Sequence, residues 1–104
     1  GARLLRAVAA GLGLDPGFFA PHYRLPLQRT QAIFYPPQPP EDEDVFGLAA
    51  HTDFGCITLL WQDSSGGLEV RERQGGAWIP APPIPGTLVV NVGDLLGRWS
   101  NDRF

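Results

Sequence analysis

The stretch from Ala49 to Asp63 reads AAHTDFGCITLLWQD and places a histidine and an aspartate just before an apolar run. The run Ile57 to Trp61 is rich in residues that favour β-strands. Side chains alternate between the two faces of a strand, so residues two positions apart point the same way. If the strand extends back through His51 and Asp53, their imidazole and carboxylate share a face. Such a pair suits a divalent first-row metal ion.

Further short strands are predicted along the rest of the chain. The 13 glycines and 11 prolines separate brief apolar runs, as turns do in an all-β protein. We expect residues 45–100 to form antiparallel strands of a sandwich or barrel, rather than strands alternating with helices. Three other candidate strands are Thr30 to Tyr35, Thr87 to Val92, and a strand whose first residues are Leu95 to Trp99. A hairpin is predicted from Leu68 to Arg73 paired with Ala77 to Ile79.

Several glycines and aspartates between these runs are interpreted as turn residues. Gly86 and Gly93 are expected to have positive φ angles, which glycine adopts without steric cost. Asp63 and Asp94 are typical of turns, because their side chains can accept hydrogen bonds from nearby backbone N–H groups.

The first residues predict one short helix. Leu4, Leu5, Val8 and Leu12 recur at helical spacing, which indicates an amphipathic helix over residues 2–12. Gly13 suits its C-terminal cap. The length of 104 residues fits one domain. Because the chain starts inside a helical pattern and stops at Phe104 without a terminal signal, we expect this domain to be partial: residues 1–28 form a helix and connector, and residues 29–104 an incomplete β core.

Composition narrows the classes of partner. The formal net charge of −3 gives no electrostatic reason to expect nucleic acid or an anionic membrane. The single cysteine, Cys56, cannot form an internal disulfide, and no apolar run approaches the roughly 20 residues of a membrane span. We expect a cytoplasmic protein with a small-molecule partner, and the sequence leaves the oligomeric state open.

A longer pattern is more specific than the His-x-Asp pair, which chance alone often produces. Residues 29–104 resemble the C-terminal catalytic domain of the isopenicillin N synthase-like iron(II)/2-oxoglutarate-dependent oxygenases. The ordered matches are Tyr35-Pro36-Pro37, His51-Thr52-Asp53, Gly66-Gly67-Leu68-Glu69-Val70, Pro85-Gly86, Asn91-Val92-Gly93-Asp94 and Trp99-Ser100-Asn101.

The resemblance implies an all-β fold, a partial double-stranded β-helix (jelly roll) with a short N-terminal helix. It implies that His51 and Asp53 are metal ligands and that Tyr35 contacts 2-oxoglutarate through its hydroxyl, a suitable donor to a carboxylate. In the family, the second histidine ligand and the arginine that binds 2-oxoglutarate lie beyond the position matching Phe104. His22 lies in the connector, where the family has no ligand, and we interpret it as a surface residue.

The activity implied by the resemblance is that of a dioxygenase using Fe(II), 2-oxoglutarate and O2. Such enzymes hydroxylate, desaturate or cyclise a small organic substrate, and the metal ligands do not decide among these outcomes. Two alternatives stay open: a catalytically inactive fragment, and a cupin-like metal-binding β-barrel with zinc or manganese hydrolase or isomerase chemistry. Metal content together with 2-oxoglutarate-dependent release of succinate separates the three.

Overall fold

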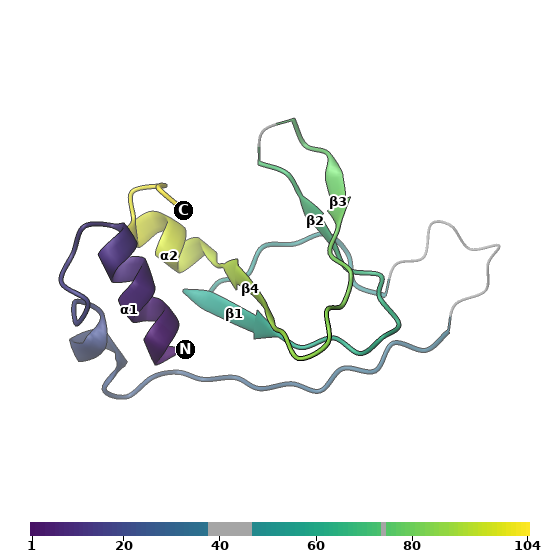
Figure 1. Ribbon diagram of the computed structural model, residues 1–104, viewed down its shortest axis with the longest axis horizontal. Helices are drawn as coiled ribbons and strands as arrows, with labels where there is room; N and C mark the ends of the chain where they lie inside the picture. Colours follow the sequence, from purple (N-terminus) through teal and green to yellow (C-terminus); the bar gives the residue numbers. More distant parts are fainter. Residues whose placement is uncertain (38–46, 74) are drawn as a thin grey trace. The chain divides into compact units, whose positions relative to one another are not determined.

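The computed structural model describes residues 1–37, 47–73 and 75–104 (Figure 1). The chain forms two compact units, Gly1–Thr52 and Asp53–Phe104. Within the described ranges, every β-strand belongs to the second unit. None of the helices in those ranges has both the length and the apolar character needed to cross a membrane.

The first unit begins with helix α1, Ala2–Gly11, which confirms the predicted helix. Leu5 and Ala9, one helical turn apart, are both buried, as expected for an amphipathic helix. Gly13 has a φ of +75° and donates its N–H to the carbonyl of Ala10, while Leu14 donates to Ala9. This pair of hydrogen bonds is the Schellman motif, so the predicted glycine cap is confirmed.

A short 3-10 helix, η1, covers Ala20–Tyr23, and irregular chain follows it. The predicted strand from Thr30 to Tyr35 is wrong, because these residues have no regular secondary structure. A strand requires a partner for its backbone N–H and C=O groups, and among the described residues none pairs with this segment. The side chains of Ile33 and Phe34 are exposed.

The second unit contains a two-stranded antiparallel sheet made of β1, Ile57–Leu60, and β4, Val89–Val92 (Figure 1). The register pairs Ile57 with Val92 and Leu60 with Val89. These strands confirm the predicted strand that begins at Ile57, and the last four residues of the one predicted from Thr87 to Val92. Gly86, in the turn before β4, has the expected positive φ of +75°.

The predicted hairpin is also confirmed. Strands β2, Glu69–Arg71, and β3, Trp78–Pro80, pair antiparallel, with Val70 opposite Ile79. Beyond the two strands, Glu72 donates its backbone N–H to Ala77 at 2.8 Å, and so extends the pairing into the turn.

The predicted strand at Leu95 to Trp99 is wrong, because Asp94–Trp99 forms a short helix, α2, directly after β4 (Figure 1). Gly93 is its N-cap with a φ of −96°, so the expected positive φ is wrong as well. Asp94 starts the helix instead of forming a turn, and Arg98 lies in its last turn. These charges have the signs that stabilise the two ends of a helix dipole. Leu96 is fully buried.

Candidate metal centre

His51 and Asp53 are not on a strand. Residues 51–53 have no regular secondary structure, so the alternation argument does not apply to them and that part of the prediction is wrong. The two residues also lie on either side of the division between the units Gly1–Thr52 and Asp53–Phe104. Each side chain is therefore characterised by its own contacts.

The imidazole of His51 is oriented by the backbone of its own segment. Its Nδ1 lies 2.9 Å from the carbonyl oxygen of Ala49. A carbonyl oxygen only accepts hydrogen bonds, so Nδ1 is the protonated nitrogen in this contact. In the neutral ring the lone pair is then on Nε2. Metal-binding histidines commonly show this arrangement, in which the second ring nitrogen donates to a backbone carbonyl.

The carboxylate of Asp53 is contacted by a side chain far away in the sequence. The amide Nδ2 of Asn91, on β4, donates to Oδ2 of Asp53 at 2.7 Å. Asn91 stands opposite Thr58 in the β1–β4 sheet, so its backbone position is fixed by strand pairing. The sequence singled out Asn91 only as part of a motif and did not predict this contact.

The backbone around Asp53 runs along the junction between β4 and α2. Gly93 donates its N–H to Cys56 at 3.0 Å, Asp94 donates to the carbonyl of Asp53 at 2.7 Å, and Leu95 donates to Phe54 at 3.2 Å. Three successive N–H groups thus hold the segment that carries Asp53. They include N–H groups of the first turn of α2, which have no partner within a helix.

Tyr35, the residue expected to bind 2-oxoglutarate, packs against the backbone of Gly47 in the first unit. A Cβ atom at Gly47 would lie 2.7 Å from Cδ1 of Tyr35, so only glycine allows the ring this position. The side chain of Tyr35 is about half exposed, at 48%. It is therefore accessible to a ligand from solvent.

Other polar residues do not assemble a complete metal site within the described parts of the chain. No group of three or more His, Cys, Asp or Glu side chains able to hold a metal ion occurs there. His22 is exposed on η1, and its ring centroid lies 6.1 Å from that of Phe18. This placement agrees with its interpretation as a surface residue.

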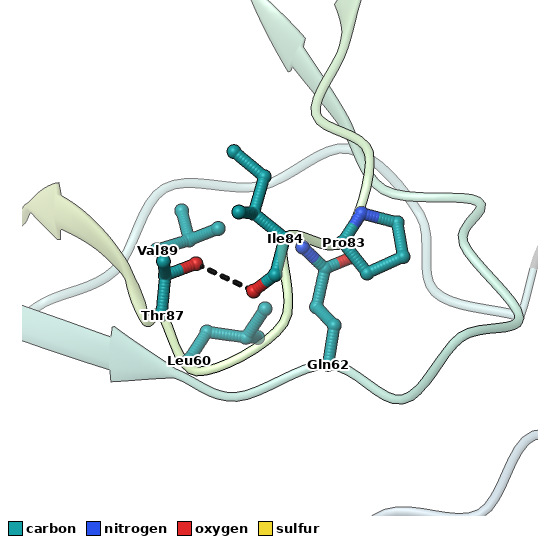
Figure 2. Close-up of a pocket in the computed structure, with 6 residues that line it drawn as sticks. All are labelled: Leu60, Gln62, Pro83, Ile84, Thr87 and Val89. Carbon is teal, nitrogen blue, oxygen red and sulfur yellow. Dashed lines mark hydrogen bonds between the residues drawn. The ribbon is translucent and has the colours of Figure 1, made fainter.

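A small hollow in the second unit lies between the end of β1 and the turn before β4 (Figure 2). Leu60, Gln62, Pro83, Ile84, Thr87 and Val89 line it. The hydroxyl of Thr87 donates to the carbonyl of Ile84 at 2.8 Å, a hydrogen bond between two residues of this turn. The volume of about 10 Å³ is that of roughly one water molecule. The hollow is therefore too small for an organic substrate.

The family model and the relatives that match this chain point to the same protein family. The family model described as the 2OG-Fe(II) oxygenase superfamily matches residues 23–104. A 2-oxoglutarate-Fe(II) type oxidoreductase of Emericella nidulans, hxnY, is 40% identical over 103 residues, which cover 97% of this chain and 30% of the relative. Gibberellin 3-beta-dioxygenase 2 of Arabidopsis thaliana is 48% identical over 81 residues, covering 75% of this chain and 23% of the relative.

A solved structure agrees with the sequence relatives. A full-length protein of Neurospora crassa, crystallised with alpha-KG (2-oxoglutarate) and thymine, matches with a TM-score of 0.72 and 33% sequence identity. The match covers 97% of this chain and 31% of that protein. The chain thus spans about 30% of the length of the first curated relative that it matches.

Proposed function

The chain belongs to the 2OG-Fe(II) oxygenase superfamily, and on that basis we propose that the whole protein oxidises a small organic molecule with iron(II), 2-oxoglutarate and dioxygen. The observation that carries this proposal is the family match over residues 23–104, which includes both His51 and Asp53. Because the chain covers about 30% of the first relative's length, the activity is proposed for the whole protein.

His51 and Asp53 are the proposed iron ligands, and their donor atoms suit the metal. Imidazole nitrogen and carboxylate oxygen are two of the donor types in the 2-His-1-carboxylate site of non-haem iron oxygenases. The contact of His51 Nδ1 with Ala49 favours metal binding through Nε2. The contact of Asn91 with Oδ2 of Asp53 places no positive charge beside the carboxylate, because an amide is a neutral donor.

We assign no second histidine ligand within residues 1–104. The only other histidine, His22, is exposed on η1 next to Phe18. We propose that the rest of the whole protein supplies this ligand. We also propose that residues 29–104 are part of a jelly-roll barrel, with the β1–β4 sheet and the β2–β3 hairpin as strands of its wall. The antiparallel pairing of both sheets supports this fold.

Each proposed site residue has a distinct task. When bound, iron(II) with 2-oxoglutarate and dioxygen supplies the oxidising power to break a C–H bond of the substrate. His51 presents its imidazole in the orientation fixed by Ala49, and Asp53 provides negative charge from a segment held by α2. Tyr35 donates its phenolic O–H to a carboxylate of 2-oxoglutarate. Its exposed side chain supports this role.

The substrate is proposed only as a small organic molecule. The Neurospora crassa protein has been crystallised with thymine and with 5-formyluracil. Pyrimidine bases therefore belong in the first panel of compounds to be tested. Hydroxylation, desaturation and ring closure are distinguished by the mass of the product.

The experiment measures succinate release by the whole protein with iron(II), ascorbate and 2-oxoglutarate. We expect slow release without added substrate, and its loss in His51→Ala and Asp53→Ala. His22→Ala is the matched control and should retain the rate of the unmodified protein. Undiminished release by His51→Ala or Asp53→Ala would contradict the ligand assignment.

The same assay decides between the oxygenase and the other interpretations. The family match favours the oxygenase over a cupin-like hydrolase or isomerase. If the protein is catalytically inactive, the whole protein should release no succinate under any condition. Release that depends on iron and not on zinc or manganese supports the oxygenase.

A further inference from the structure

We propose that Asn91 is a positioning residue for the metal ligand Asp53, an inference that rests on the function proposed above. The observation is the hydrogen bond of 2.7 Å from Asn91 Nδ2 to Asp53 Oδ2. The two residues are 38 positions apart in sequence, so the contact is a product of the fold and not of a local turn.

Both ends of this hydrogen bond are held by backbone structure. Asn91 is an interior residue of β4, paired with Thr58 of β1. Asp53 accepts the N–H of Asp94 on its backbone carbonyl at 2.7 Å. The side-chain contact is therefore one of several between the segment that starts at Asp53 and the segment from Asn91 to Leu95. An accidental contact between exposed side chains would lack this support on both sides.

The hydrogen bond from Asn91 restricts the orientation of the Asp53 carboxylate toward a metal ion. A carboxylate has two oxygens, and its plane rotates about the Cβ–Cγ bond unless one oxygen is held. With Oδ2 held by the amide, rotation of the carboxylate is restricted, and so is the orientation in which it meets a metal ion. Lysine and arginine can also donate hydrogen bonds to a carboxylate, but their positive charge would oppose the binding of a cation. Asparagine provides the hydrogen bond without that charge.

The experiment uses the whole protein and titrates it with Co(II) and Mn(II), which stand in for oxygen-sensitive iron(II). Asn91→Leu removes the donor with little change in volume, and Asn91→Ala removes it with a smaller side chain. The matched control is Gln62→Leu, because Gln62 also donates an amide N–H, to the carbonyl of Ala81 at 3.2 Å in the same unit. Calorimetry gives the affinity, and the visible spectrum of bound Co(II) reports the geometry of its ligands.

We expect both Asn91 variants to bind metal about 10- to 100-fold more weakly than the unmodified protein, the usual cost of losing a hydrogen bond to a metal ligand. The Co(II) spectrum should change, while Gln62→Leu should leave affinity and spectrum unaltered. A role limited to stability would lower the melting temperature without changing the spectrum of the folded protein, and would overturn the proposal.

Different results would contradict the role of Asn91 and the proposed function on which it rests. Unchanged affinity and spectrum in Asn91→Leu and Asn91→Ala, with metal binding lost in His51→Ala and Asp53→Ala, overturn only the role of Asn91. Unchanged metal binding in His51→Ala and Asp53→Ala overturns the ligand assignment itself. If Asn91→Leu does not fold, the smaller Asn91→Ala provides the decisive measurement.

Discussion

The backbone of Gly93 lies close to the carbonyl oxygen of Gly55, with no room between them for a side chain at position 93. A Cβ atom at Gly93 would overlap that oxygen and would lie 2.7 Å from the carbonyl oxygen of Asp53. Both neighbours are backbone atoms, which cannot rotate away as a side chain can. Glycine is therefore required at position 93 for close approach and not for a positive φ, since its φ is −96°.

The first prediction follows from this packing. Gly93→Ala should destabilise the protein by about 1–3 kcal/mol, the usual cost of forcing an extra carbon into a filled space. Gly55→Ala is the control, because a Cβ there meets no atom within 4 Å. Its effect on the free energy of unfolding should stay within about 0.5 kcal/mol. Chemical denaturation measures both, and equal effects would contradict the packing argument.

The second prediction concerns the two adjacent leucines of α2. Leu96 is fully buried, whereas Leu95 is 41% exposed. Leu96→Ala should lower the free energy of unfolding by about 2–5 kcal/mol, because it leaves a cavity as well as losing apolar burial. Leu95→Ala should cost clearly less. A larger loss for Leu95→Ala in thermal or chemical denaturation would show that α2 faces the other way in the whole protein.

The third prediction tests Tyr35 as a contact for 2-oxoglutarate. Tyr35→Phe removes only the hydroxyl, and a hydrogen bond to a charged group contributes enough free energy that KM for 2-oxoglutarate should rise about tenfold or more. Metal affinity should not change. Tyr23→Phe alters the other tyrosine of the chain, on η1, and is the control.

A related variant tests the position of the Tyr35 ring. Gly47→Ala should also raise KM for 2-oxoglutarate, because a Cβ at position 47 would displace the ring. An unchanged KM in both Tyr35→Phe and Gly47→Ala would show that Tyr35 does not bind 2-oxoglutarate.

The fourth prediction concerns Asp63, which lies at the turn after β1. The backbone N–H of Ser65 donates to its Oδ1 at 2.8 Å. This hydrogen bond, and a weaker effect of the Ser65 side chain, lower the pKa of Asp63 below its ordinary value. A lowered pKa stabilises the fold above the unfolded-state pKa, and this contribution is lost as the pH falls through the folded-state pKa.

NMR titration of the Asp63 carboxyl carbon measures that pKa directly. Ser65→Ala removes only the side-chain contribution, so the pKa of Asp63 should rise in part and stay below its ordinary value. A full return to the ordinary value would show that the hydroxyl, and not the backbone N–H, is the main cause.

The sequence by itself determined the family and most of the local elements. Three local signals are the helical spacing of Leu4, Leu5, Val8 and Leu12, the cap at Gly13, and the strand-forming run from Thr87 to Val92. Each acts within a few residues, where backbone propensity and hydrophobic period dominate. His51 and Asp53 were found by a motif, and their roles as ligands stay a proposal.

Only the tertiary structure decided what depends on contacts between distant segments. Leu95 to Trp99 is apolar enough for a strand, but Leu96 reaches a buried position from a helix that begins at Asp94. Thr30 to Tyr35 has a strand-like sequence and, within the described residues, no strand to pair with. The hydrogen bond from Asn91 to Asp53 joins residues 38 positions apart. No local propensity encodes such contacts, because their free energy is gained only when the chain brings both partners together.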